Sequence, residues 1–154
     1  MGTEIEHKFL LANDNWRGLA PGVDYRQGYL CATPERTVRV RIAGDQGFLT
    51  IKGPDSGLSR AEYEYPIPHA DALALLDTLC PRPQIEKKRH TIHHDGFIWE
   101  VDEFFGENQG LVVAEIELEY EGQKFSRPDW VGEEVSGDSR YANAALCLHP
   151  YSRW

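Results

Sequence analysis

The sequence has few features of a secreted, disulfide-linked or membrane-spanning protein. Its three cysteines, Cys31, Cys80 and Cys147, are widely spaced and include no Cys-x-x-Cys pair. This odd number excludes a simple disulfide framework, and the spacing gives no zinc site. Residues 1–20 carry several charges, which excludes the apolar segment of a signal peptide. No stretch approaches the roughly 20 apolar residues that span a bilayer. We therefore expect a cytoplasmic protein that does not contact a membrane.

Basic residues are scarce relative to acidic ones. Lys and Arg number 16 against 25 Asp and Glu, which gives a formal net charge of -9. Because affinity for nucleic acids and anionic membranes depends on clustered cations, this balance disfavours both partners. Phosphate binding stays open if the few cations converge, or if carboxylates hold a metal ion. The chain also lacks the glycine-rich dinucleotide motif and the P-loop, and strands mostly follow strands, which excludes a Rossmann fold.

The dominant pattern in the 154 residues is alternation of apolar and polar side chains, which predicts β-strands. Helical spacing predicts a helix at 69–79, with Leu73, Leu76 and Leu79 on one face, and a second helix at 139–148, capped by Ser139. We also predict a helical turn at 129–134 and a loop at 53–57. Consecutive antiparallel strands favour closure into a barrel, which removes exposed sheet edges. We predict one domain over 1–154, mainly β in class, with an eight-stranded antiparallel closed barrel and a few helices. The predicted strands are 3–11, 23–31, 36–43, 48–52, 59–68, 84–93, 96–104 and 111–120.

Several predicted strands carry charges of one sign on one face, because alternate side chains of a strand point the same way. The examples are Glu4 with Glu6, Glu115 with Glu117 and Glu119, Arg39 with Arg41, and Lys87 with Arg89. Periodicity alone favours the ordinary arrangement, in which apolar faces point inward and charges are solvated. Ordinary surfaces, however, intersperse the two signs. The alternative is a cavity in which carboxylates bind a divalent cation while Arg and Lys bind phosphate oxygens.

The chain also carries an ordered series of motifs: 4–8 (EIEHK), 27–30 (QGYL), 37–41 (TVRVR), 49–53 (LTIKG), 60–65 (RAEYEY), 87–89 (KKR), 99–102 (WEVD), 114–118 (AEIEL) and 134–143 (EVSGDSRYAN). The first fits an ExExK pattern, which alone is a weak signal. Taken in order, the series resembles the CYTH, or triphosphate tunnel metalloenzyme, superfamily, and in particular its short bacterial members. The resemblance covers essentially the whole chain.

The resemblance implies a barrel whose charged faces point into a central tunnel, which reverses the expectation from periodicity. It implies that helices at 69–79 and 139–148 cover the outer apolar faces. Apart from the resemblance, we expect Glu100 and Glu119 to be solvated or tunnel-rim charges rather than ligands. Lys8 and Tyr29 are expected to be catalytic and to pair across neighbouring strands. Lys8 is also expected to bind phosphates, together with Arg39, Arg41, Lys52, Lys87 and Arg89. One metal ion is expected on Glu4, Glu6 and Glu117, and a second, carrying the attacking water, on Asp102, Glu115 and Glu62, with Glu64 as a further participant.

The activity that the resemblance implies is metal-dependent hydrolysis of inorganic tripolyphosphate to diphosphate and phosphate, with two Mg²⁺ or Mn²⁺ ions. The chain would then be a hydrolase of phosphoanhydride bonds that acts on a triphosphate-containing small molecule. The alternatives are a class IV-type adenylate cyclase, a thiamine or nucleoside triphosphatase, and a non-catalytic polyphosphate-binding barrel. The non-catalytic barrel would gain nothing from converging carboxylates, and the sequence shows no adenine site. A homodimer is compatible with each of these readings.

Overall fold

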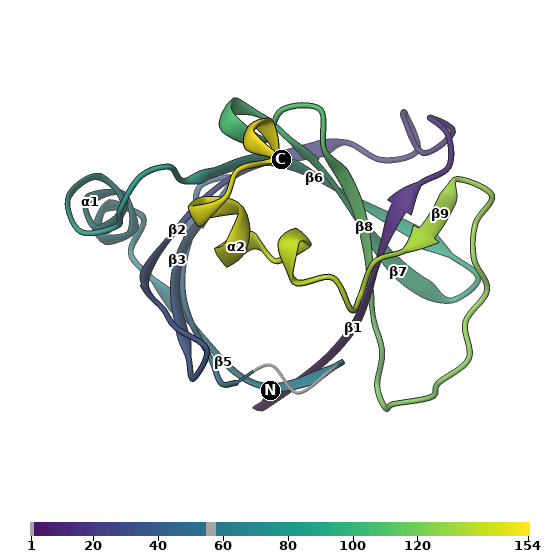
Figure 1. The fold of residues 1–154 in the computed structure, drawn as a ribbon, viewed down its shortest axis with the longest axis horizontal. Coiled ribbons are helices and arrows are strands. Elements are labelled where there is room, and N and C mark those ends of the chain that lie inside the picture. The colour runs from purple at the N-terminus through teal and green to yellow at the C-terminus, as the bar shows by residue number, and fades with distance from the viewer. Residues whose placement is uncertain (1, 55–57) are drawn as a thin grey trace.

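The computed structural model describes residues 2–54 and 58–154. Its main element is an antiparallel sheet that closes on itself, which confirms the predicted eight-stranded barrel; Figure 1 shows the ring along its axis. Of the loop predicted at 53–57, residues 55–57 lie outside the described residues. The barrel strands are β1 (Gly2–Leu11), β2 (Gly22–Ala32), β3 (Thr37–Ala43), β4 (Gln46–Lys52), β5 (Ser59–Ile67), β6 (Ile85–His94), β7 (Phe97–Phe104) and β8 (Val112–Glu117).

The strand order round the barrel is β5-β4-β3-β2-β6-β7-β8-β1, and the pairing of β1 with β5 closes it. Two-residue turns join β3 to β4 and β6 to β7. Between β6 and β7, Asp95 and Gly96 both have positive φ, at 49° and 79°. Such a turn matches the right-handed twist of the two strands that it connects. Closure makes the inner faces of all eight strands line one interior space.

Apolar side chains on the outside of the barrel form its largest core cluster. Phe9, Trp99 and Ile116, from β1, β7 and β8, pack with Trp16 and Trp130 in this cluster. The two tryptophans come from the segments that follow β1 and β8, so connecting segments cover this side of the sheet. Burial of this apolar outer layer provides the hydrophobic stabilisation, which allows the inner faces to carry charge.

Helix α1 (His69–Thr78) packs outside the barrel against β3 and β4, where it was predicted (Figure 1). Its buried residues are Ala72 and Leu76. The predicted apolar face was wrong, because Leu73 and Leu79 are 39% and 63% exposed. Spacing of four residues places Ala72 and Leu76 on one side of the helix, and that side meets the sheet.

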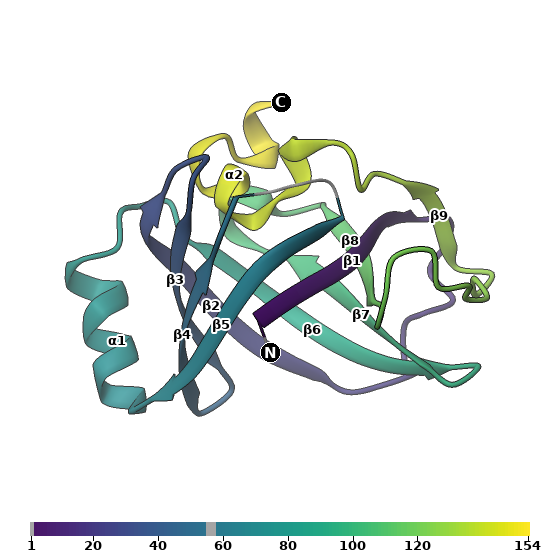
Figure 2. The same cartoon turned by 90° about the horizontal axis from the view of Figure 1, so that it is seen from below.

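The C-terminal segment lies across one end of the barrel, so the expectation that 139–148 covers an outer face was wrong (Figures 1 and 2). It contains a 3₁₀ turn (Ser139–Tyr141) and helix α2 (Asn143–Leu148), and α2 contacts β2 and β6. Tyr141 and Leu146 pack there on Phe104. The cap of the 3₁₀ turn is Asp138, not the predicted Ser139. An apolar helix face can be read from sequence, whereas the surface that it covers depends on the course of the chain.

Residues 131–134, predicted as a helical turn, form strand β9 (Val131–Glu134), which pairs with the end of β1. Glycine and glutamate have weak strand preference, so this strand depends on pairing with β1 rather than on its own sequence. Two further 3₁₀ turns span Gly106–Asn108 and Tyr151–Arg153. None of the helices in the described ranges is long and apolar enough to cross a membrane.

Candidate active site

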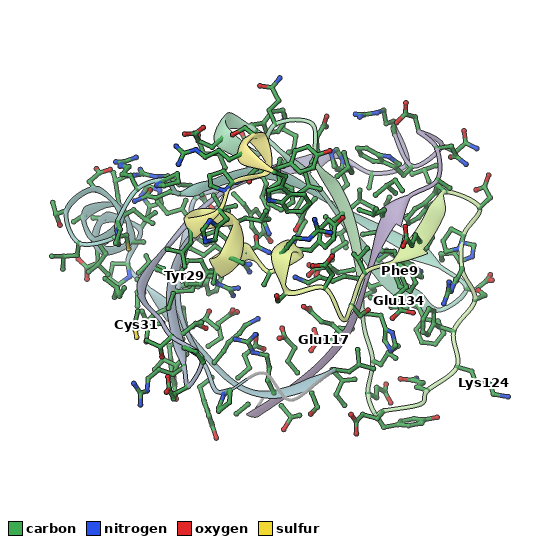
Figure 3. The ribbon with its side chains drawn as sticks, in the orientation of Figure 1. Phe9, Tyr29, Cys31, Glu117, Lys124 and Glu134 are labelled. Atoms are coloured by element: carbon green, nitrogen blue, oxygen red, sulfur yellow. The ribbon has the colours of Figure 1, made fainter. Side chains whose placement is uncertain are left out.

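A cavity of about 340 Å³ occupies the barrel interior, and all eight strands contribute side chains to its lining. The charged faces therefore point inward. In Figure 3, Tyr29 and Glu117 lie on opposite sides of the ring. The predicted site residues that line the cavity are Glu4, Glu6, Lys8, Tyr29, Arg39, Arg41, Lys52, Glu62, Glu64, Lys87, Arg89, Glu115 and Glu117.

An acidic wall is formed by Glu4 and Glu6 of β1, Glu62 of β5 and Glu117 of β8. Glu6 lies directly opposite Glu117 in the β1–β8 ladder. Burial, followed by the charges of neighbouring carboxylates, raises the pKa of Glu6 to about 8 and also raises that of Glu117. Glu4 differs, because Lys52 Nζ lies 2.9 Å from its Oε1 and lowers its pKa against the effect of burial. The acidic wall therefore has more carboxylate groups than the cations beside it can neutralise.

A basic wall on the other side of the ring is formed by Arg39 and Arg41 of β3 and by Lys87 and Arg89 of β6. Burial, followed by the charges of Arg39 and Arg89, lowers the pKa of Arg41 to about 10. Burial also lowers the pKa of Lys87 to about 7, and the two neighbouring guanidiniums act in the same direction. The charged forms of Arg41 and Lys87 are therefore disfavoured, as expected where cations crowd in a buried site. Arg89 differs, because Asp102 raises the pKa of its guanidinium against the effect of burial.

Asp102 lies behind the cavity lining. Its carboxylate is 1% exposed and accepts hydrogen bonds from Lys87 Nζ at 2.7 Å and from Arg89 Nε at 2.8 Å. Although burial opposes ionisation, Arg89 and Lys87 hold the pKa of Asp102 well below its usual range. Arg89 NH2 also lies 3.2 Å from Glu115 Oε1. In this arrangement Asp102 fixes two side chains of the basic wall.

The carboxylates do not form a closed metal site by themselves. Within residues 2–54 and 58–154, no group of three or more His, Cys, Asp or Glu side chains has the geometry to hold a metal ion. Glu62 lies beside Glu4, and β1 separates its strand from that of Glu115, one of its predicted co-ligands. The donor set nevertheless fits a hard divalent cation, because Glu6 and Glu117 offer oxygen ligands whose ionisation needs a compensating positive charge. The two predicted ligand sets stay predictions.

Tyr29 and Lys8 do not lie on neighbouring strands, so that part of the prediction was wrong. Tyr29 is on β2, between β3 and β6, whereas Lys8 is on β1, next to β5, β8 and β9. Both side chains line the cavity. Burial opposes the charge of Lys8, but Glu115, Glu6 and, less strongly, Tyr29 raise the pKa of its ammonium group. The two side chains therefore interact across the cavity and not along a strand ladder.

Sequence reasoning missed four residues of the site. Arg60 lines the cavity, and Glu100, predicted as a solvated or rim charge, also lines it and lies 3.2 Å from Arg89. Each is two residues from a predicted member of the site, so strand alternation could have identified both. Gln27 and Asn143 contact the basic wall through hydrogen bonds. Both amides lie in motifs of the sequence, at 27–30 and 134–143, but no role was assigned to either.

Known proteins share this arrangement of strands. The CYTH domain model matches residues 2–144. An inorganic triphosphatase of Acetivibrio thermocellus is 52% identical over 154 residues, which cover 100% of this chain and 99% of the relative. An inorganic triphosphatase of Nitrosomonas europaea is 39% identical over 151 residues, covering 95% and 97%. The crystal structure of an inorganic triphosphatase is 36% identical, with a TM-score of 0.67 over 94% of this chain and 97% of that chain.

Proposed function

The chain belongs to the CYTH domain family, and on this premise we propose that it is an inorganic triphosphatase that hydrolyses tripolyphosphate to diphosphate and phosphate. The proposal includes dependence on divalent cations, with Mg²⁺ or Mn²⁺ as the ions and two of them per site. The net charge of -9 supports a small-molecule substrate and disfavours nucleic acid.

The observation that carries the proposal is one cavity that holds both signs of charge, with one wall mainly acidic and the other mainly basic. Seven carboxylate residues and seven Lys or Arg residues line it, so its formal charge is balanced. A bare polyanion would meet as many carboxylates as cations. A triphosphate bound to divalent cations has both signs, and its overall charge is small. This complementarity favours a metal–triphosphate complex over simple polyphosphate storage.

The residues of the basic wall would stabilise the triphosphate. Arg39, Arg41 and Lys87 would contact phosphoryl oxygens and stabilise the charge that shifts between them during transfer, where electrostatics and positioning provide most of the catalysis. Lys8, whose raised pKa keeps its ammonium protonated, would stabilise the departing phosphate. Tyr29, from the opposite side of the cavity, would orient the same group.

The acidic wall would hold the cations. Glu4, Glu6 and Glu117 would bind one ion. Glu115, Glu62 and Asp102, with Glu64 as a further participant, are the predicted ligands of the other, which would require Asp102 to give up a hydrogen bond from Lys87 or Arg89. When bound, a divalent cation neutralises phosphoryl charge and makes a water molecule more acidic. In the absence of that charge, Lys52 and Lys8 partly compensate Glu4 and Glu115.

The adenylate cyclase alternative requires a site for adenine as well as for the triphosphate. An adenine ring commonly stacks on an aromatic side chain. The cavity lining includes Tyr25, but guanidinium carbons of Arg41 and Arg89 both lie 4.9 Å from its ring centroid. These contacts occupy the Tyr25 ring, but Tyr29 and Phe48 also line the cavity, so identification of the product from ATP is what separates hydrolysis from cyclisation.

Phosphate release from tripolyphosphate, ATP and thiamine triphosphate tests the proposal, with Mg²⁺, with Mn²⁺ and with EDTA. We expect the fastest release from tripolyphosphate, none in EDTA, and no cyclic AMP from ATP. Absence of release from tripolyphosphate with either metal would contradict the proposed function. Chromatography that shows cyclic AMP as the main product would favour the cyclase.

A further inference from the structure

Gln27 connects the basic wall to the C-terminal segment through its amide group. The side chain is fully buried on β2, opposite Arg41 in the β2–β3 ladder. Its Oε1 accepts a hydrogen bond from Arg41 Nε at 2.8 Å, and its Nε2 donates to Asn143 Oδ1 at 3.3 Å. Asn143 Oδ1 also accepts from Lys87 Nζ at 3.0 Å. Two neutral amides therefore join two cations of the basic wall.

The chemistry of the partners fixes the orientation of both amides. Arginine and lysine side chains donate hydrogen bonds and accept none. The oxygen of Gln27 must therefore face Arg41, and the oxygen of Asn143 must face Lys87. The remaining amino group of Gln27 then donates to Asn143, as the structure shows. The network has one self-consistent arrangement.

Arg41 differs from its neighbours on the basic wall in what it contacts. Lys87, Arg89 and Arg39 each form an ion pair with a carboxylate. Within the described parts of the chain, Arg41 has no carboxylate within 4.0 Å, and the bond from Nε to Gln27 is its one side-chain hydrogen bond. Its ring contact is with Tyr25, 4.9 Å from the guanidinium carbon. Among the described residues, neither terminal amino group of Arg41 therefore has a protein acceptor.

We propose that Gln27, held by Asn143, is a positioning residue that orients Arg41 through a neutral hydrogen bond and leaves the positive charge of Arg41 for the triphosphate. The inference rests on the proposed function. A carboxylate at position 27 would orient the guanidinium equally well but would neutralise it. An apolar side chain would leave the charge intact but would free the guanidinium to move.

The test is the affinity for the Mg²⁺ complex of an imido-bridged, non-hydrolysable tripolyphosphate analogue, measured by titration calorimetry for the parent, Gln27→Glu and Gln27→Met. We expect Gln27→Glu to weaken binding by about tenfold or more. The new carboxylate would neutralise Arg41, and hydrogen bonds between charged groups, such as that from Arg41 to a phosphate oxygen, are among the stronger ones. Gln27→Met should weaken it less. The melting temperature of Gln27→Glu is measured alongside, because the new carboxylate gains Arg41 as an ionic partner but can no longer donate to Asn143 Oδ1.

A double-mutant cycle identifies the route of the effect. If Gln27 acts through Arg41, then Gln27→Glu should cause little further loss of affinity in the Arg41→Ala background. A residue that only supports the barrel would weaken binding to the same extent in both backgrounds. Parental affinity in Gln27→Glu, or equal losses with and without Arg41, would overturn the inference.

Gln84 provides a matched control outside the cavity. It is also buried, at 8% exposure, and its Oε1 accepts from Arg26 Nε at 3.0 Å. Gln84→Glu makes the same chemical change beside an arginine that does not line the cavity, so we expect unchanged affinity whatever its effect on stability. Because the titration does not require turnover, a parent that binds the analogue but releases no phosphate from tripolyphosphate would contradict the proposed function and not this inference.

Discussion

The acidic wall and the basic wall are built on the same alternating strands, but their charges are paired to different degrees. On the basic wall, Asp102 binds both Lys87 and Arg89 at 2.7–2.8 Å. On the acidic wall, the nearest cation to Glu6 is Lys8 at 3.9 Å, the longest of the ion pairs inside the cavity. Paired groups therefore hold the barrel interior together, while the least paired groups on each wall are left to bind ligands.

Removing the most heavily paired cation should have the largest effect on stability. Arg89 forms ion pairs with Asp102 at 2.8 Å and with Glu115 at 3.2 Å, and Arg89→Ala removes both. Loss of one member of a buried ion pair costs about 3–5 kcal/mol. For a chain of this size we expect the melting temperature in EDTA to fall by about 10 °C.

The control for Arg89→Ala is Arg17→Ala, which removes a partly exposed pair with Glu103. Exposed ion pairs contribute about 0–1 kcal/mol, so its melting temperature should change little. Equal changes for the two variants in differential scanning calorimetry would contradict the structural role of pairing.

Removing the unpaired cation should affect turnover and leave stability nearly unchanged. Val40 and Ile42 provide the packing of β3, and Arg41 has no carboxylate partner in the described ranges. We expect Arg41→Ala to lose about 2–4 kcal/mol of transition-state stabilisation, measured as kcat/KM for tripolyphosphate. Kinetics within twofold of the parent would show that Arg41 does not contact the substrate.

The pH dependence of stability should be smaller and opposite for the two walls. Glu6 has its pKa raised from 4.5 to about 8, so the folded protein binds this proton more tightly than the unfolded chain does. Stability in EDTA should then fall as pH rises through that window. The pKa of Lys87 is lowered from 10.5 to about 7, so its contribution increases with pH between those values.

Melting temperatures in EDTA from pH 5 to pH 8 check this expectation. The decline with pH should be shallower in Glu6→Gln, which has no titrating group at that position. Parallel curves for the parent and the variant would show that Glu6 does not titrate in this range.

The barrel could be predicted from sequence because each strand carries its own period-two signal. Two elements could not. The strand Val131–Glu134 has little strand preference of its own and forms by pairing with β1. Helix Asn143–Leu148 has an apolar face, but its position across the barrel end depends on the preceding turn. These depend on contacts between distant parts of the chain.

Site residues could be predicted from the sequence where they lie in a motif and on the charged face of an alternating strand. Alternation correctly groups Arg39 with Arg41, but it contains no strand order, so it could not show that Tyr29 and Lys8 face each other across the cavity. Gln27 lies in the motif at 27–30, but the motif does not show that its amide bonds to Arg41 and Asn143, because those partners lie on other elements. The single-domain extent, the cytoplasmic location and the homodimer stay predictions.

The most direct test of the central claim, that the acidic wall is built for a divalent cation, is a set of melting curves with EDTA and with saturating Mg²⁺ or Mn²⁺. In the parent, metal at about 100 times its dissociation constant should add about 2.7 kcal/mol. Glu6→Gln should melt at the same temperature as the parent or higher in EDTA, because it removes one crowded carboxylate, and should gain much less from metal. The exposed Glu119→Gln is the matched control and should respond to metal as the parent does. Equal metal-induced shifts in the parent and Glu6→Gln would contradict the account.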